Sequence, residues 1–278
     1  MQSTSPFLWL FPLLALLGGA GVSSAGDSQA LKRGAAHLKK LSQEARADLV
    51  GKQTFEVQLV GKRIGQFDLA MALAEEGGVS VEWTRKTRVP NSPSSNESEG
   101  TTRLGPRLEL LEARRRQTTT PDPEPGEAPE DAFPPSVRVR TVTRKGKDWS
   151  ALSGPEAGPN ELVVGAGPKP VVVKGVKGPV YGELGNLLVL GRVFSRARSG
   201  RYALPQIAWE EKKKKTKALR IRVTPAKDFV FRGRKTAGAV RVVLDEGEPI
   251  LGIVMTFDSK GRLLDLSFGG LRYLALEK

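Results

Sequence analysis

Histidine and cysteine, the side chains on which most hydrolytic and metal sites depend, are nearly absent from this chain. His37 is the single histidine among 278 residues, and there is no cysteine. A serine triad would have to use His37, and no nucleophile-elbow sequence accompanies it. The glycines within residues 165–175 lack the spacing of a phosphate-binding loop.

One acidic cluster could in principle hydrolyse a glycoside, because Asp245, Glu246 and Glu248 lie close together in the sequence. However, the DEGEP sequence of residues 245–249 has the composition of a hairpin turn. The sequence therefore predicts a protein that is not an enzyme, with no catalytic residue, no metal site and no cofactor.

Positive charge is concentrated in one part of the chain. The formal net charge is +14, and residues 196–241 hold 15 basic and three acidic side chains. Residues 212–215 are four consecutive lysines, expected at the exposed tip of a hairpin. In the strand expected at residues 219–223, Arg220 and Arg222 share the face opposite the apolar side chains. The candidate anion-binding residues are Lys212, Lys213, Lys214, Lys215, Arg220, Arg222, Arg232 and Arg234.

Such a surface attracts anionic partners, and phospholipid headgroups, lipopolysaccharide or an acidic polymer would all fit it. The alternative is a solubilising loop tip that discourages pairing at a sheet edge. Nucleic acid would fit the charge, but no nucleic-acid-binding motif is present.

Large aromatic side chains recur in the expected strands, and their simplest interpretation is a hydrophobic core. The alternative is the lining of an apolar cavity between a curved sheet and a helix. The candidate cavity residues are Phe55, Phe67, Trp83, Trp209, Phe257 and Phe268.

The N-terminal 25 residues resemble an export signal. Residues 7–22 are apolar apart from Pro12, and small residues follow at 23–25. Since residues 1–6 carry no Lys or Arg, an uncleaved membrane anchor is the alternative. An exported chain of this size without disulfides suggests a bacterial periplasmic or extracellular protein.

Hydrophobic periodicity predicts the elements that follow. Residues 26–50 have the three-and-four spacing of an amphipathic helix, with Leu31, Ala35 and Leu38 on its apolar face. Residues 51–89 then alternate with a period of two, as antiparallel strands do. Residues 90–136 are rich in Ser, Pro and acidic side chains and predict a largely disordered insertion, with one strand possible at 104–116.

The β domain is expected to resume at residue 137 and to continue to residue 278. Its first strand, residues 137–142, is expected to direct Arg138, Arg140 and the following Arg144 outward. Residues 186–194 fit either a short helix or a strand. The closing segments, residues 250–257 and 263–268, predict a β-hairpin across the turn at 258–261. The predicted fold is mainly β: a strongly curved antiparallel sheet, half-barrel or open barrel, with an N-terminal amphipathic helix.

Two turn sequences carry a family resemblance: GKRIG at residues 61–65 and TFDSKGRLL at residues 256–264. With the export signal, they resemble exported bacterial domains of unknown function that have a half-barrel sheet, which are themselves similar to periplasmic lipoprotein carriers. The resemblance touches residues 53–89 and 203–276. It implies a curved sheet with a helix against it and no catalytic residues.

The sequence thus favours a non-enzymatic, exported cell-envelope protein that binds an amphipathic or anionic envelope component, with peripheral membrane contact possible. The second hypothesis is a scaffolding protein whose insertion, residues 90–136, contacts a protein partner.

Overall fold

The computed structural model describes residues 24–41, 43–74, 77–122, 134–156, 169–209, 215–245 and 252–276. The expected export signal lies almost wholly outside these residues, as do Lys212, Lys213 and Lys214. The helices are α1 (Ser24–Lys39), α2 (Gln43–Ala47) and α3 (Leu184–Phe194). The strands are β1 (Gly51–Leu59), β2 (Lys62–Leu73), β3 (Val79–Arg88), β4 (Ser94–Leu104), β5 (Leu110–Pro121), β6 (Ser136–Lys145), β7 (Asp148–Pro155), β8 (Val171–Val173), β9 (Gly200–Ile207), β10 (Thr216–Pro225), β11 (Val230–Phe231), β12 (Arg234–Lys235), β13 (Val240–Asp245), β14 (Ile253–Phe257), β15 (Leu263–Phe268) and β16 (Leu271–Ala275).

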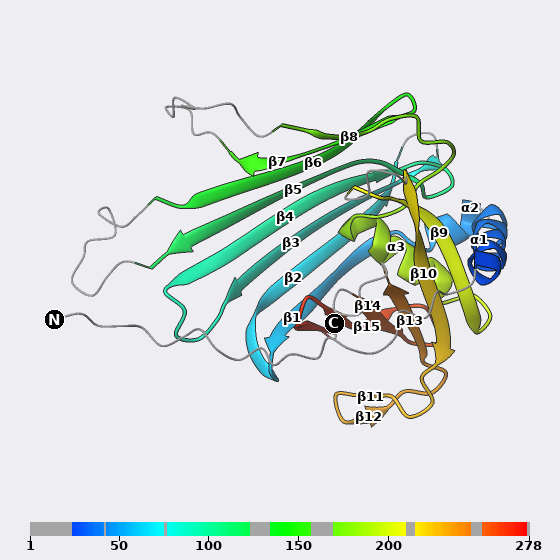
Figure 1. Ribbon diagram of the computed structural model, residues 1–278. Helices are drawn as coiled ribbons and strands as arrows, with labels where there is room; N and C mark the ends of the chain where they lie inside the picture. The colour runs from blue at the N-terminus through cyan, green and yellow to red at the C-terminus, as the bar shows by residue number, and fades with distance from the viewer. Residues whose placement is uncertain are drawn as a thin grey trace, which may run out of the picture.

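Within the described part of the chain, fourteen strands form a single antiparallel sheet in the order β8-β7-β6-β5-β4-β3-β2-β1-β16-β15-β14-β13-β10-β9. The pairing of β1 with β16 joins two strands from opposite ends of the chain, so that β2–β8 extend from one side and β15, β14, β13, β10 and β9 from the other (Figure 1). Strands β11 and β12 form a separate two-stranded sheet. The expected hairpin is β14 and β15, and its turn places Gly261 at a φ of 77°. The expectation of a mainly β, strongly curved antiparallel sheet is confirmed.

The sheet curves until its two edges nearly meet. The segment after β8 reaches the β9 edge, where the Tyr181 amide donates to the Pro205 carbonyl at 2.8 Å. Tyr181 and Gln206 also form a single parallel bridge. The result is a nearly closed barrel rather than an open half-barrel.

Helix α3 lies inside the curve of the sheet, and nine of its 11 residues are buried (Figure 1). Two glycines allow it to approach the strands closely. A Cβ on Gly185 would overlap the Thr102 side chain of β4, and a Cβ on Gly191 would overlap Met255 of β14. Of the two alternatives at residues 186–194, the structure has the helix.

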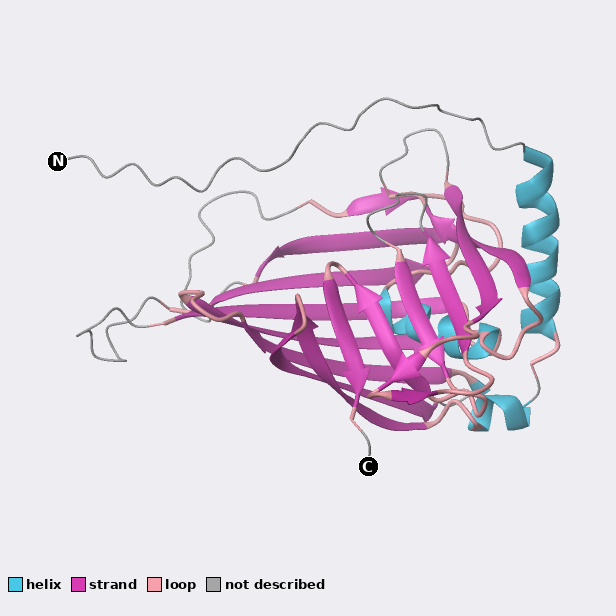
Figure 2. Cartoon of the chain, turned by 90° about the horizontal axis from the view of Figure 1, so that it is seen from below, coloured by secondary structure: helices cyan, strands magenta, loops and turns pink. Residues whose placement is uncertain are grey.

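Helix α1 packs on the outside of the barrel, against β9 (Figure 2). The buried positions of its contact face are Gly34 and Leu38, whereas Ala35, expected on that face, is exposed. Gly34 is needed because a Cβ there would overlap the Ala203 carbonyl oxygen. The expected helix at 26–50 is two helices, with a break after Lys39.

The prediction of a largely disordered insertion at residues 90–136 is wrong for much of its length. Residues 94–104 form β4 and residues 110–121 form β5, which are long strands paired on both edges. The inward positions of β4 include the small residues Ser98, Gly100 and Thr102, which fit under Trp83 and α3. Backbone pairing and close packing therefore stabilise strands that have little apolar area of their own. Residues 123–133 lie outside the described part of the chain.

Candidate functional site

The inner face of the sheet changes from apolar to basic along strands β3 to β6. Ala113 and Val142 are register partners on β5 and β6 and belong to the core. Two residues further along the same face, Arg115 pairs with Arg140. Arg85 of β3 lies opposite Ser98 of β4, which pairs with Gln117 of β5, so Arg85 is one inward step away from the row of Arg115 and Arg140.

The prediction that Arg138 and Arg140 point outward is therefore wrong. Side chains alternate along a strand, and Val142, which is fully buried, shares its face with both arginines. Val137 and Val139 take the outer face instead. Residues 137–140 alternate Val with Arg, so the valines offered an apolar face and the arginines a basic one. The sequence alone did not decide which of these faces lies inside the barrel.

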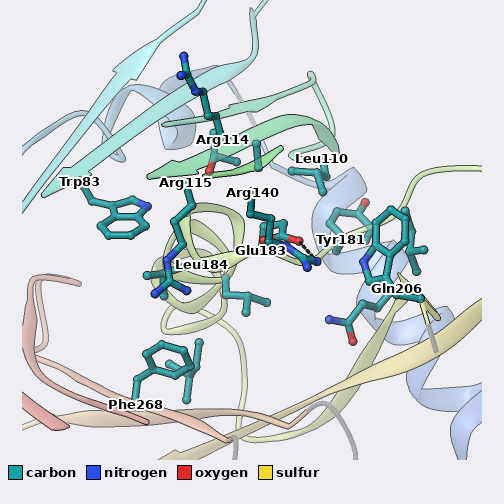
Figure 3. A pocket seen from close by; sticks show the side chains of 18 of the residues that line it. Trp83, Leu110, Arg114, Arg115, Arg140, Tyr181, Glu183, Leu184, Gln206 and Phe268 are labelled. Carbon is teal, nitrogen blue, oxygen red and sulfur yellow. Dashed lines mark hydrogen bonds and ion pairs between the residues drawn. The ribbon is translucent and has the colours of Figure 1, made fainter. Parts of the chain in front are cut away.

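These arginines border a cavity of about 450 Å³ between the barrel wall and the start of α3, here called the α3 recess. Its apolar lining is Trp83, Leu110, Ala113, Leu184, Leu187, Ile207, Trp209, Ile253 and Phe268, and its polar lining includes Arg85, Thr102, Arg114, Arg115, Arg140, Tyr181, Glu183 and Gln206. Figure 3 shows Arg115 extending into the recess beside Leu184 and toward Phe268, whereas Arg114 points away from it. The recess thus combines an apolar wall with a basic one.

Two guanidinium groups in the recess have few partners. Arg85 donates from Nη1 to the Tyr273 hydroxyl at 3.1 Å and from Nη2 to Ser98 Oγ at 3.4 Å. Its Nε is buried without a hydrogen-bond partner among the described residues. Arg115 donates from Nη2 to Gln117 Oε1 at 3.2 Å. Neither arginine makes an ion pair within the described chain, which leaves donors free for an anion.

The electrostatics of the recess are strongly positive. Burial lowers the pKa of Arg115, and the nearby charges of Arg85 and Arg140 lower it further, while Glu183 opposes the shift. Glu183 is the only acidic side chain among the described residues that line the recess, and it pairs with Arg140. A ligand carrying negative charge would relieve this repulsion.

The segment before α3 is held firmly at the edge of the recess. The Gly182 amide donates to Asn186 Oδ1 at 2.8 Å, and Asn186 Nδ2 donates to the Leu108 carbonyl at 2.8 Å. Glu183 itself has φ 60° and ψ 149°, a combination that is costly for any residue with a Cβ. Such strain persists only where the surroundings enforce it, and it is concentrated at functional sites.

The six aromatic residues expected around a cavity divide into two groups. Trp83, Trp209 and Phe268 line the α3 recess. The other three, Phe55, Phe67 and Phe257, are fully buried in the core. Phe67 connects the two groups, since its ring centroid lies 6.2 Å from that of Trp83 and 5.7 Å from that of Phe55.

The candidate anion-binding residues do not converge on the recess. Arg220 pairs with Asp27 of α1 at 3.4 Å, and Arg232 donates to the Ala275 carbonyl at 3.2 Å. Lys215 donates to the Gly175 carbonyl at 3.4 Å. Arg222 and Arg234 are exposed. The binding role of this outer surface stays a prediction, whereas the basic residues that share one recess are Arg85, Arg115 and Arg140, which sequence reasoning missed.

The described residues contain no group of three or more His, Asp or Glu side chains that could hold a metal ion. His37 serves packing: its Nε2 lies 3.4 Å from the Val193 carbonyl oxygen, and its ring is 4.8 Å from that of Phe194. None of the described helices is both long enough and apolar enough to cross a bilayer.

Fold and site together define a nearly closed antiparallel barrel with an arginine-lined interior recess. No family model matches the chain, and no curated protein matches it significantly. Among solved structures, it is similar to the beta-barrel-like protein of Domain of Unknown Function DUF1849 from Brucella abortus. The identity is 13%, the match covers 81% of this chain and 95% of the other, and the TM-score is 0.47. The resemblance to lipoprotein carriers, and export itself, stay predictions.

Proposed function

We propose that this chain is a non-enzymatic, exported cell-envelope protein that binds an apolar-tailed anion in the α3 recess. The tail would lie against Trp83, Leu184 and Phe268, and the anionic head would lie against Arg85 and Arg115. The proposal keeps the amphipathic ligand that the sequence favours and moves its charged contacts from the outer surface to the interior.

The observation that supports the proposal is that one cavity contains both apolar walls and guanidinium groups without ion-pair partners among the described residues. A volume of about 450 Å³ lies within the range of small-ligand sites. Burying unpaired charge weakens a fold, so a protein that keeps Arg85 and Arg115 in its interior gains from a ligand that neutralises them. A purely structural interior would be filled by apolar side chains at lower cost.

The test is titration of the purified protein with dodecyl phosphate, below its micelle concentration, by calorimetry and by tryptophan emission. We expect saturable binding at one molecule per chain, weaker as salt rises, and much weaker binding of dodecanol. Arg115→Met should lower the affinity by roughly 10-fold or more, since a hydrogen bond to a charged group contributes about 1.5–3 kcal/mol.

Arg116→Met is the matched control. Arg116 is the next residue of β5, faces outward and pairs with Glu156 at 2.8 Å. It carries the same charge but does not line the recess, so its substitution should leave the affinity unchanged. Absence of binding, or equal losses in the two variants, would contradict the proposal.

A scaffolding role for residues 90–136 also stays a prediction. Because β4 and β5 belong to the barrel, it is now confined to the parts of this region outside those strands.

A further inference from the structure

A second cavity adjoins the α3 recess along the inner face of β5 and β6. Its volume is about 360 Å³, and Arg115 and Arg140 line both cavities. Here called the β6 recess, it is bordered in addition by Gln117, Arg138 and Ser153. The two cavities share Arg115 and Arg140 and are here together called the path. Its β6 end adds the basic side chain of Arg138 to an apolar lining from Val139 and Pro155.

The register sets the spacing of the basic side chains along this path. Arg115 pairs with Arg140, and Gln117 pairs with Arg138, so all four residues share the inner face. Successive inward residues on one strand lie about 7 Å apart. Arg138 lies one step from Arg140 along β6 and in the same row as Arg85, three strands away. Three strand spacings amount to about 14 Å, so a single carboxylate cannot contact Arg138 together with Arg85.

The charges of the path are far from balanced. Arg85, Arg115, Arg138 and Arg140 face it, and Glu183 is the one acidic side chain among the described residues lining either cavity. Arg138 is exposed and makes no ion pair within the described chain. One guanidinium group can bind two phosphate oxygens at once. Three guanidinium groups along the path therefore suit a head group with several phosphate oxygens.

We propose that the ligand is an apolar chain with a multiply charged phosphate head, a diphosphate or two neighbouring phosphates. The head spans Arg85, Arg115 and Arg138, and the tail enters the α3 recess. This inference rests on the proposed function and narrows it to one ligand class.

The experiment compares three ligands with the same tail: dodecanoate, dodecyl phosphate and dodecyl diphosphate. Their dissociation constants are measured by calorimetry on the full chain, its Arg138→Gln variant and the control Arg144→Gln. Arg144 lies on the same strand and carries the same charge, but it packs 5.9 Å from the Trp149 ring and lines neither cavity.

We expect the diphosphate to bind at least about 10-fold more tightly than dodecanoate. Arg138→Gln should weaken diphosphate binding about fivefold and dodecanoate binding less than twofold, and Arg144→Gln should change neither. Equal affinities for the three ligands, or equal effects of the two variants, would overturn this inference and leave the proposed function standing. Failure of all three ligands to bind would overturn both.

Discussion

Arg140 donates a hydrogen bond from Nη2 to Oε1 of Glu183 at 3.1 Å, and this ion pair joins β6 to the residue that precedes α3. Both side chains are partly shielded from water, with exposed fractions of 39% and 23%. The Glu183 carboxylate makes no capping hydrogen bond to the helix. It therefore acts as the internal counter-ion of the arginine cluster, and its charge also acts on Arg115, where a ligand's anionic head would lie.

Glu183→Gln is expected to raise the affinity for dodecyl phosphate several-fold. The substitution removes the negative charge that opposes an anionic head at Arg115, while it keeps the shape of the side chain. Calorimetry measures the change. The control is Glu112→Gln on the outer face of β5, where Glu112 lies 3.6 Å from Arg103. Equal gains in both variants would mean that the net charge of the protein, and not the charge of Glu183 inside the recess, controls the affinity.

Arg115→Met is expected to stabilise the ligand-free protein. Burial and the charges of Arg85 and Arg140 lower the pKa of Arg115, so its charged form is unfavourable in the fold. Methionine removes the repulsion and fills similar space. Since Arg115 is partly exposed, we expect a small rise in Tm, of about 2 °C in a protein of this size.

Arg116→Met should have the opposite effect on Tm, because its hydrogen bond to Glu156 raises the pKa of Arg116 and favours the charged form. Differential scanning fluorimetry without ligand compares the two variants. A lower Tm for Arg115→Met would show that Arg115 serves the fold rather than a ligand.

Gly100→Ala is expected to destabilise the barrel by about 1–3 kcal/mol, the typical cost of overpacking. A Cβ at this position would overlap the indole ring of Trp83, which crosses β4 at this point. Urea unfolding measures the loss. In a Trp83→Phe background the penalty should shrink, since the smaller ring leaves room. Thr101→Ala, on the outer face next to Gly100, should cost much less.

Tyr181 is expected to make stability sensitive to alkaline pH. Burial raises its pKa well above the ordinary value of 10.0, Glu109 raises it further, and Arg107 opposes the shift. The unfolded chain therefore loses this proton first. Stability from the protonated phenol is fully present below about pH 10 and declines as pH rises above it.

Tyr181→Phe should consequently flatten the fall in the free energy of unfolding above pH 10. Urea unfolding at a series of pH values, together with tyrosinate absorbance, tests this. An unchanged pH dependence would mean that Tyr181 ionises in the fold as readily as in the unfolded chain.

The local pattern of apolar and polar residues was sufficient to predict many strands of the sheet. The strict alternation of Leu219, Ile221 and Val223 predicts a strand with one buried face, and β10 has that form. The closing hairpin was equally predictable from the sequence, because two apolar segments flank a turn that contains a glycine. In the structure this glycine, Gly261, has a positive φ. In β10 the side chains alone determine which face is buried, since only one face is apolar.

The arrangement of the site depends on pairing between distant strands, which no single segment of the sequence specifies. Alternation shows that Arg138, Arg140 and Val142 share a face, but not that this face lies inside, because Val137 and Val139 offered an apolar alternative. Strand β4 has few apolar residues and is stabilised by pairing on both edges. The arginine cluster exists only because Arg85, on β3, meets Arg115 and Arg140 across a curved sheet.

The sequence by itself determined the strand pattern, the basic character and the scarcity of the usual catalytic side chains. Only the tertiary structure decided which arginines face the interior and that α3, rather than the N-terminal helix, fills the barrel. The physical reason is that register and curvature arise from long-range backbone pairing, and these place residues far apart in the chain around one cavity.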